Sequence, residues 1–259
     1  MKRIIINAGL GLMSLFIVFS CLKDAEDVYI SYGVIQNVRS SNDYEIRTDK
    51  GNTLKVLKSN TSQTIENDKR VLVNFEILSE KDKNKQVYDV SVNGFYQLLS
   101  KPVVAESFIL EAEEIRRDSI GNDPFSKIHA AFGGNYINID FEVLYAQYSD
   151  VKHLINLVYD DLRKDADTIY LSLFHNAYGE VPGNNMYLHR GVGRSSFKIS
   201  DLLPPGVTSK PVKITWYEYV YNNEARQRSS AGTFRLGEKP DNNIRLTQQL
   251  GFDSSLGVK

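Results

Sequence analysis

Alternation of apolar and other residues is the main pattern of residues 28–104. Two runs show it clearly, one at Val28, Ile30, Tyr32, Val34 and Val38 and one at Val71, Val73, Phe75 and Ile77. A period of two is typical of β-strands that bury one face. Between the runs, Asp49-Lys50-Gly51-Asn52 predicts a hairpin turn in which Gly51 can adopt positive φ. Five short strands in about seventy residues favour a small closed barrel of the OB type.

A second block, residues 125–259, continues the alternation with Ile137, Ile139, Phe141, Val143 and Tyr145. Further strands are predicted at 153–159, 168–174, 186–199, 212–220 and 232–236. Six or seven strands at this spacing favour an Ig-like β-sandwich. The predicted fold class is therefore all-β, a small OB-type barrel (28–104) followed by an Ig-like β-sandwich (125–259).

Residues 105–124 form the predicted linker between the two domains. Phe108, Ala112 and Ile115 lie at near-helical spacing among several glutamates, which indicates either a short helix or an extended connector. Gly121-Asn122-Asp123-Pro124 predicts a turn at the domain boundary.

The first residues have the pattern of an export signal. Lys2 and Arg3 precede an apolar run, Ile4 to Phe19, which is shorter than the ~20 apolar residues of a spanning helix. The run ends in Val18-Phe19-Ser20-Cys21, which resembles the bacterial lipobox, although Phe19 is bulkier than usual. We therefore expect a cleaved lipoprotein signal peptide at 1–20, acylation of Cys21 and a lipidated tether at 21–27. The alternative is a thiol that lies by chance just after a signal cleaved elsewhere.

Charge narrows the choice of partners. The chain has formal net charge −1, and loss of the two positive charges of the signal leaves −3. Without a basic excess, nucleic acid is not an expected partner. Several acyl chains on Cys21 would hold the protein firmly at a membrane. The acidic stretch Leu22–Asp27 resembles the surface-export tag of some Bacteroidetes lipoproteins, but a solvated tether is an equal reading. We expect an outer membrane lipoprotein on the cell surface or the periplasmic face.

Several motifs together resemble the NigD-like family of Bacteroidales lipoproteins. They are Gly121-Asn122-Asp123-Pro124, Gly134-Asn135-Tyr136-Ile137-Asn138-Ile139, Leu171-Ser172-Leu173-Phe174-His175-Asn176, and Ser196-Phe197 before Asp201-Leu202-Leu203. The resemblance covers the mature chain and implies an N-terminal OB domain and a C-terminal β-sandwich. Phe174 stands where a basic residue is expected before His-Asn. The family takes its name from a member proposed as a bacteriocin immunity protein, and it supplies no catalytic residues.

Candidate chemistry in the sequence is sparse. The four histidines, His129, His153, His175 and His189, show no close ligand pair, so we expect no metal site and no cofactor. His175 is expected to be half-buried and bonded to a turn. Ser195-Ser196-Phe197-Lys198 matches S-x-x-K but falls on a predicted strand, where positions three apart face opposite sides. Asp160, Asp161, Asp165 and Asp167 lack the glycine turn of a calcium loop and are expected in a solvated turn.

Two features indicate contact with other molecules. Asp118-Ser119-Ile120 resembles the O-glycosylation acceptor of Bacteroidetes exported proteins, which makes Ser119 a candidate acceptor; Asp167-Thr168-Ile169 matches less convincingly. Tyr217, Tyr219 and Tyr221 alternate with Trp216 and Val220, so they are expected to face away from the core. Tyrosine is favoured at interfaces because of its large contact area. The stripe is either a partner contact or is covered by a neighbouring loop or domain.

The sequence leaves three functional hypotheses. The first is a lipid-anchored, non-enzymatic envelope protein that binds an unknown protein or glycan, with immunity to a bacteriocin as one version. The second is a surface accessory in polysaccharide or nutrient capture. The third, an enzyme, requires converging titratable groups, and nothing in the sequence points to them.

Overall fold

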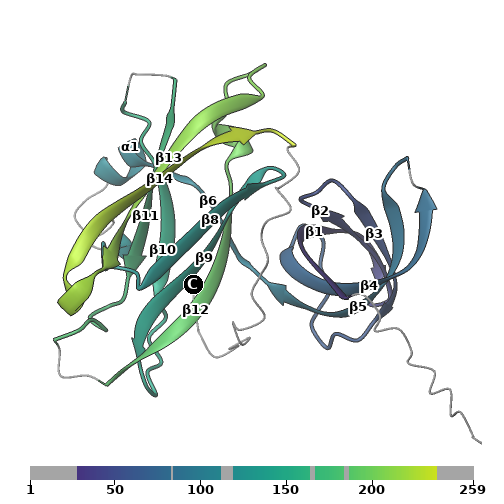
Figure 1. Ribbon diagram of the computed structural model, residues 1–259, viewed down its shortest axis with the longest axis horizontal. Helices are drawn as coiled ribbons and strands as arrows, with labels where there is room; N and C mark the ends of the chain where they lie inside the picture. Colours follow the sequence, from purple (N-terminus) through teal and green to yellow (C-terminus); the bar gives the residue numbers. More distant parts are fainter. Residues whose placement is uncertain (1–27, 83, 112–118, 164–166, 184–186, 238–259) are drawn as a thin grey trace, which may run out of the picture.

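The computed structural model describes residues 28–82, 84–111, 119–163, 167–183 and 187–237. The predicted signal peptide, Cys21 and tether lie outside the described residues. The described chain is nearly all β, as predicted, with a barrel followed by a sandwich (Figure 1).

The first domain is a closed five-stranded barrel in the order β1-β2-β3-β5-β4. Its strands are β1 (Val28–Ser40), β2 (Asp43–Thr48), β3 (Thr53–Ser59), β4 (Arg70–Asp82) and β5 (Val87–Gln97). Only the β3–β5 pair is parallel. The interior is filled by side chains that include Ile35, Tyr44, Ile46, Val71 and Val73. The predicted OB-type barrel is confirmed.

The sequence pattern of the first strand indicated the wrong residues as buried. Gly33 and Ile35, rather than Val28, Ile30 and Val34, are the buried positions of β1. Gly33 faces Ile46 so closely that a Cβ would lie 2.6 Å from the Ile46 Cγ2 atom, so only glycine fits. Sequence patterns count glycine as neutral, and this hides an inward position that has no side chain.

The second domain is a sandwich of two sheets. The five-stranded sheet has the order β14-β13-β11-β10-β7, and the four-stranded sheet has the order β6-β12-β9-β8. Its strands are β6 (Leu99–Pro102), β7 (Val104–Ala105), β8 (Lys127–Gly133), β9 (Tyr136–Ala146), β10 (Leu154–Tyr159), β11 (Ile169–Asn176), β12 (Leu188–Lys198), β13 (Ser209–Tyr219) and β14 (Ala225–Arg235). The core between the sheets includes Phe125, Ile139, Phe141, Leu171 and Phe197.

Residues 99–105 join the two sheets along one edge of the sandwich. β6 pairs in parallel with β12, and β7 pairs in parallel with β10. The chain therefore enters the sandwich directly after the last barrel strand. Residues 99–104, predicted as part of the barrel domain, thus belong to the sandwich, and the predicted linker at 105–124 begins at the end of these first sandwich strands. The helix α1 (Glu106–Leu110) follows, so of the two alternatives for the start of this segment the short helix is the correct one. Two 3₁₀ turns, Ser200–Leu202 and Tyr221–Asn223, lie beside β13.

The barrel covers the outer face of the four-stranded sheet through a buried polar network. Arg70 of β4 donates to both carboxylate oxygens of Asp49, at 2.6 and 2.9 Å, to Asn138 Oδ1 at 2.7 Å and to Ser196 Oγ at 3.0 Å. Its guanidinium also lies 4.0 Å from the ring centroid of Tyr136. Fork geometry of this kind orients two partners as well as attracting them.

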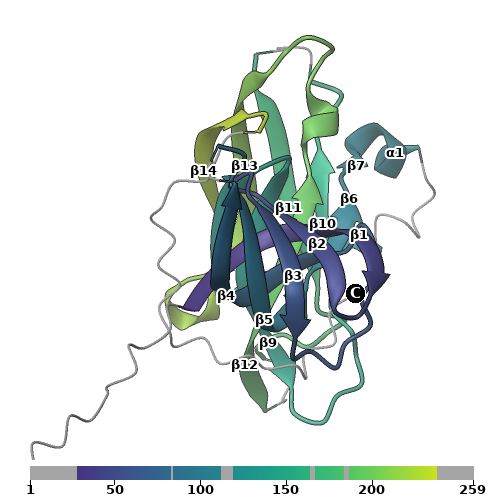
Figure 2. The same ribbon diagram turned by 90° about the vertical axis from the view of Figure 1, so that its right-hand side faces the viewer.

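A second contact joins the domains beside this network. The Tyr32 hydroxyl donates to Asp140 Oδ1 at 2.9 Å, and Arg194 pairs with the same carboxylate at 3.3 Å. Burial, followed by the Asp140 charge, raises the pKa of Tyr32. The layers are therefore barrel, four-stranded sheet, core and five-stranded sheet, with α1 on the side far from the barrel (Figure 1), and Figure 2 shows the same molecule from the barrel side.

Candidate functional site

The outer face of the five-stranded sheet is the sandwich surface that the barrel does not cover. Ser172 Oγ and Thr215 Oγ1 lie 3.1 Å apart across β11 and β13, so both side chains point to the same face. Leu171, Leu173 and Ile214 point to the core. Because strand side chains alternate, Phe174 and Tyr217, two residues further along each strand, share the outer face.

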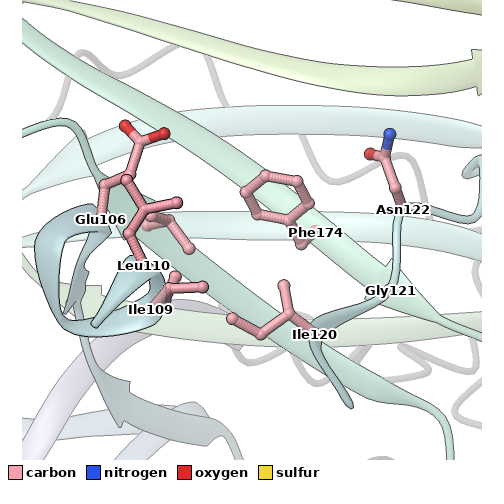
Figure 3. A pocket seen from close by; sticks show the side chains of 8 residues that line it. Glu106, Ile109, Leu110, Ile120, Gly121, Asn122 and Phe174 are labelled. Atoms are coloured by element: carbon pink, nitrogen blue, oxygen red, sulfur yellow. The ribbon is translucent and has the colours of Figure 1, made fainter. Parts of the chain in front are cut away.

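A pocket of about 650 Å³ lies on this face beside α1 (Figure 3). Phe174 of β11 and Val158 of β10 come from the sheet itself, whereas the other lining residues come from α1 and from the segment before β8. The full lining is Glu106, Ile109, Leu110, Ile120, Gly121, Asn122, Val158 and Phe174. The pocket is largely apolar and carries one carboxyl group, that of Glu106. Such a surface suits a ligand that combines apolar and polar groups.

One wall of the pocket is fixed by hydrogen bonds to the end of β11. The Asp123 N–H donates to the His175 carbonyl at 2.7 Å, and Asp123 Oδ2 accepts from the Ala177 N–H at 2.7 Å. Asn176 Nδ2 donates to the Ser119 carbonyl at 3.1 Å. These bonds attach the 119–123 segment to the strand.

Gly121 explains why this wall packs so closely. It has φ +67°, and a Cβ on it would lie 2.5 Å from the Asn176 Cβ. Any other residue meets both a strained backbone and a clash. Gly121–Pro124 and His175-Asn176, which carried the family resemblance separately, therefore form one structural unit at the pocket.

A chain of buried titratable groups lies under this unit. His175 Nε2 is 3.0 Å from His153 Nδ1, and His153 Nε2 is 3.1 Å from Glu180 Oε2, which also accepts from the Ala146 N–H at 2.7 Å. Burial, and then the neighbouring His153, lower the pKa of His175 to about 3. Burial alone would raise the pKa of Glu180, but hydrogen bonds from Ser149, the Ala146 backbone and His153 outweigh it and lower that pKa.

This arrangement corrects the prediction for His175, which is fully buried rather than half-buried. Its ring lies against Phe125 and His153 and forms part of the core. Sequence spacing gave no signal, because the partners come from separate segments. Because His175 Nε2 and His153 Nδ1 hydrogen bond to each other, this row of side chains is not arranged around a cation. Among the described residues, no group of three or more His, Cys, Asp or Glu side chains is placed to hold a metal ion.

The acidic turn after β10 contributes to the charge near the pocket. Burial, and then the charge of the nearby Asp160 carboxylate, raise the pKa of Glu106. Asp161 accepts from the backbone N–H and the hydroxyl of Ser107, and these bonds lower the pKa of Asp161. Asp160 also pairs with Arg163 at 3.3 Å. This edge of the pocket is therefore acidic, and Asp160 and Asp161, predicted only as a solvated turn, approach α1.

The predicted tyrosine stripe is divided by the structure. Tyr217 and Tyr219 are half-buried on β13 and bracket the segment at Phe125, which bonds to both of their backbones. Burial, and then Asp123, raise the pKa of Tyr219 to about 12. Tyr221 lies beyond the strand in a 3₁₀ turn and is 88% exposed. Tyr217 and Tyr219 extend the outer face next to the pocket, and their contact with a partner stays a prediction.

The remaining sequence candidates lie elsewhere. Ser119 is exposed at the pocket wall, and its glycosylation also stays a prediction. Ser195 and Lys198 lie on β12, as expected from the strand pattern, and Ser196 belongs to the interdomain network. Within the described ranges, no helix is long and apolar enough to cross a membrane.

Comparison with known proteins identifies the family. Residues 32–97 match the NigD-like N-terminal OB domain, and residues 107–228 match the NigD-like C-terminal beta sandwich domain. The chain belongs to the NigD-like family. The predicted resemblance is thereby confirmed, and the family's two domains coincide with the barrel and the sandwich. No curated protein matches this NigD-like chain.

Solved structures share its fold. A protein described as toxin-related from Parabacteroides distasonis is 24% identical, with a TM-score of 0.61 over 81% of this chain and 94% of its own. A NigD-like immunity protein from Bacteroides caccae is 18% identical, with a TM-score of 0.57 over 79% and 92%. A protein described as a lipoprotein from Bacteroides fragilis is 12% identical, with a TM-score of 0.55 over 81% and 100%. At these identities the likeness establishes the fold alone.

Proposed function

We propose that this NigD-like protein is a lipid-anchored, non-enzymatic envelope protein with an immunity-like role. In this proposal it resides in the outer membrane and binds a protein partner with the outer face of its five-stranded sheet. The observation that carries the proposal is the pocket beside α1, whose wall is built by the motifs typical of the family. The description of one structural neighbour as an immunity protein supports the same reading.

The chemistry of this face favours binding over catalysis. Phe174, Ile109 and Leu110 offer apolar contact area, and Tyr217 adds an amphipathic surface at its border. Glu106 and Asp160 are the carboxyl pair nearest the pocket, and burial and the Asp160 charge raise the pKa of Glu106. In a binding site, this acidic edge suits a partner that brings a cationic group next to an apolar one.

A protection assay tests the proposal. The full-length protein is expressed in a strain that is sensitive to bacteriocins of related producers, and growth is measured under challenge. We expect protection by the wild type and its loss in the double variant Tyr217→Ser/Tyr219→Ser and in Phe174→Ser. The matched control is Tyr148→Ser, because Tyr148 is 93% exposed and lies away from the face. Full protection by the outer-face variants would contradict the proposed site.

A second candidate function is capture of polysaccharide or other nutrients at the cell surface. Three tyrosines at one end of the sandwich are strongly exposed: Tyr148, Tyr178 and Tyr187. Their loops are joined, since the Ala146 N–H bonds to Glu180, and the Tyr187 ring packs edge-on against His189. Exposed aromatic rings are suited to stacking on sugars. Retarded migration in polysaccharide gels that is abolished by Tyr148→Ser/Tyr187→Ser, and not by Tyr217→Ser, would favour this function.

A further inference from the structure

An apolar patch remains uncovered at one end of the barrel. Its members are at the start of β1 and in the second half of β4, and each is between 39% and 54% exposed: Val28, Tyr29, Ile30, Ile77 and Leu78. Val28 pairs with Glu76 across the two strands, so Val28, Ile30 and Leu78 share the outer face of the barrel. Tyr29 stacks on Phe75 at the barrel mouth. We call these five residues the β1–β4 patch.

The two strands that carry the patch are paired with each other. The barrel is closed, and β1 and β4 are hydrogen bonded to each other along Val28–Val34 and Arg70–Glu76. A second chain therefore cannot insert a strand between β1 and β4 there. The patch also offers exposed apolar side chains, and apolar surface that gathers on a monomer marks a contact site.

The length of chain that precedes the patch indicates the occupant. Six residues, Leu22 to Asp27, separate Cys21 from Val28. Even a fully extended chain of that length spans no more than about 25 Å. If Cys21 carries the lipid, Val28 is held within that distance of the bilayer, about the diameter of a small domain. Apolar residues close to the anchor are thus among those left uncovered.

We infer that the β1–β4 patch is a membrane-contact face, which lies in the headgroup region of the bilayer that holds the lipid anchor. The inference rests on the proposed lipidation at Cys21. Val28, Ile30 and Leu78 enter the interfacial zone, and Tyr29 places its amphipathic ring at the headgroups. Acyl chains hold the protein at the membrane, whereas the patch fixes its orientation.

This orientation has a consequence for the binding site. The barrel and the helix α1 lie at opposite ends of the molecule in Figure 1. The rigid polar network at Arg70 connects the barrel to the sandwich between them. A barrel that rests on the bilayer therefore directs the pocket away from the membrane, where a partner can reach it.

A fluorescence experiment on the lipidated protein tests the inference. Acylation consumes Cys21, the single cysteine, so Leu78→Cys provides one unique site for an environment-sensitive probe such as NBD. The control is Tyr148→Cys, because Tyr148 is highly exposed on the sandwich. Both proteins are reconstituted in vesicles of phosphatidylethanolamine and phosphatidylglycerol. We expect a blue shift and quenching by nitroxide lipids at position 78 and neither effect at position 148.

The outcomes separate the inference from the proposed function on which it rests. Flotation with the vesicles and the mass of the protein report lipid attachment independently of the probe. If the protein is acylated and floats while the position-78 probe stays in water, the membrane-contact face is refuted and the anchor stands. If no acyl chain is found, both fail. A blue shift without vesicles that grows with protein concentration would assign the patch to a second copy of the chain and overturn the inference.

Discussion

Replacing Arg70 with alanine probes the contact that makes the two domains one unit. Arg70 is 2% exposed and makes four hydrogen bonds, two of them to Asp49. Its removal leaves the Asp49 carboxylate, which is 7% exposed, with a hydrogen bond from the Asn138 amide at 2.9 Å. Breaking a buried pair by deleting one partner costs about 3 to 5 kcal/mol. We expect a loss of that size in the free energy of unfolding.

Two further variants isolate the cause of that loss. Arg39→Ala removes an arginine whose pair with Asp43 is exposed, at 69% and 56% for the two side chains, so it should cost less than about 1 kcal/mol. Arg70→Met/Asp49→Leu removes both charges together and should recover much of the stability, because no uncompensated charge stays buried.

Urea unfolding followed by circular dichroism and tryptophan fluorescence measures these differences. Trp216, the single tryptophan, lies in the sandwich, so its fluorescence reports that domain alone. We expect both signals to coincide in the wild type and to separate in Arg70→Ala, since the barrel then unfolds independently. The reasoning is refuted if Arg70→Ala costs no more than Arg39→Ala and the two signals stay coincident.

Three other predictions concern the candidate site. The pKa of His175 is about 3 in the folded protein and 6.5 in the unfolded chain, so between these pH values only the unfolded chain binds this proton. The free energy of unfolding should therefore fall by about 1.4 kcal/mol for each pH unit below about pH 6. His175→Gln should flatten this slope in urea titrations at different pH values. Gly121→Ala should lower the free energy of unfolding by about 1 to 3 kcal/mol, measured by urea unfolding, because of its positive φ and its contact with Asn176; Gly206→Ala, also at positive φ but with open space, is the control and should cost less. Glu106→Gln should raise the melting temperature at neutral pH, because it removes a carboxylate that burial and Asp160 disfavour; an unchanged melting temperature at neutral pH would contradict this.

The architecture was largely accessible from the sequence. Alternating runs such as Val71–Phe75 and Ile137–Val143 place every second side chain in the core of their domain, and this is enough to predict two β-domains. Strands without such a pattern were missed or shortened. β6 and β7 are too short to show a period, and β14 is polar along most of its length because nearly all of it is exposed.

The candidate site was only partly accessible, for a different reason. The motifs at Gly121 and His175 were recognisable, but nothing in the sequence shows that the Gly121 segment packs on the end of β11. His153 and Glu180 reach His175 from separate segments, so the spacing of histidines carried no information. Asn138 and Asp140 have the alternation of solvent-facing positions, and only the packing of the barrel reveals that they lie at an interface.

Photo-crosslinking in cells tests most directly that the outer face of the five-stranded sheet binds a partner. The photoreactive residue p-benzoylphenylalanine is placed at Phe174 or Tyr217, with Tyr148 as the control position. A crosslink to a second polypeptide at positions 174 and 217, and none at position 148, is the result expected here. Crosslinks at position 148 alone would contradict the account. So would the absence of crosslinks at positions 174 and 217 in cells that the protein still protects against the bacteriocin.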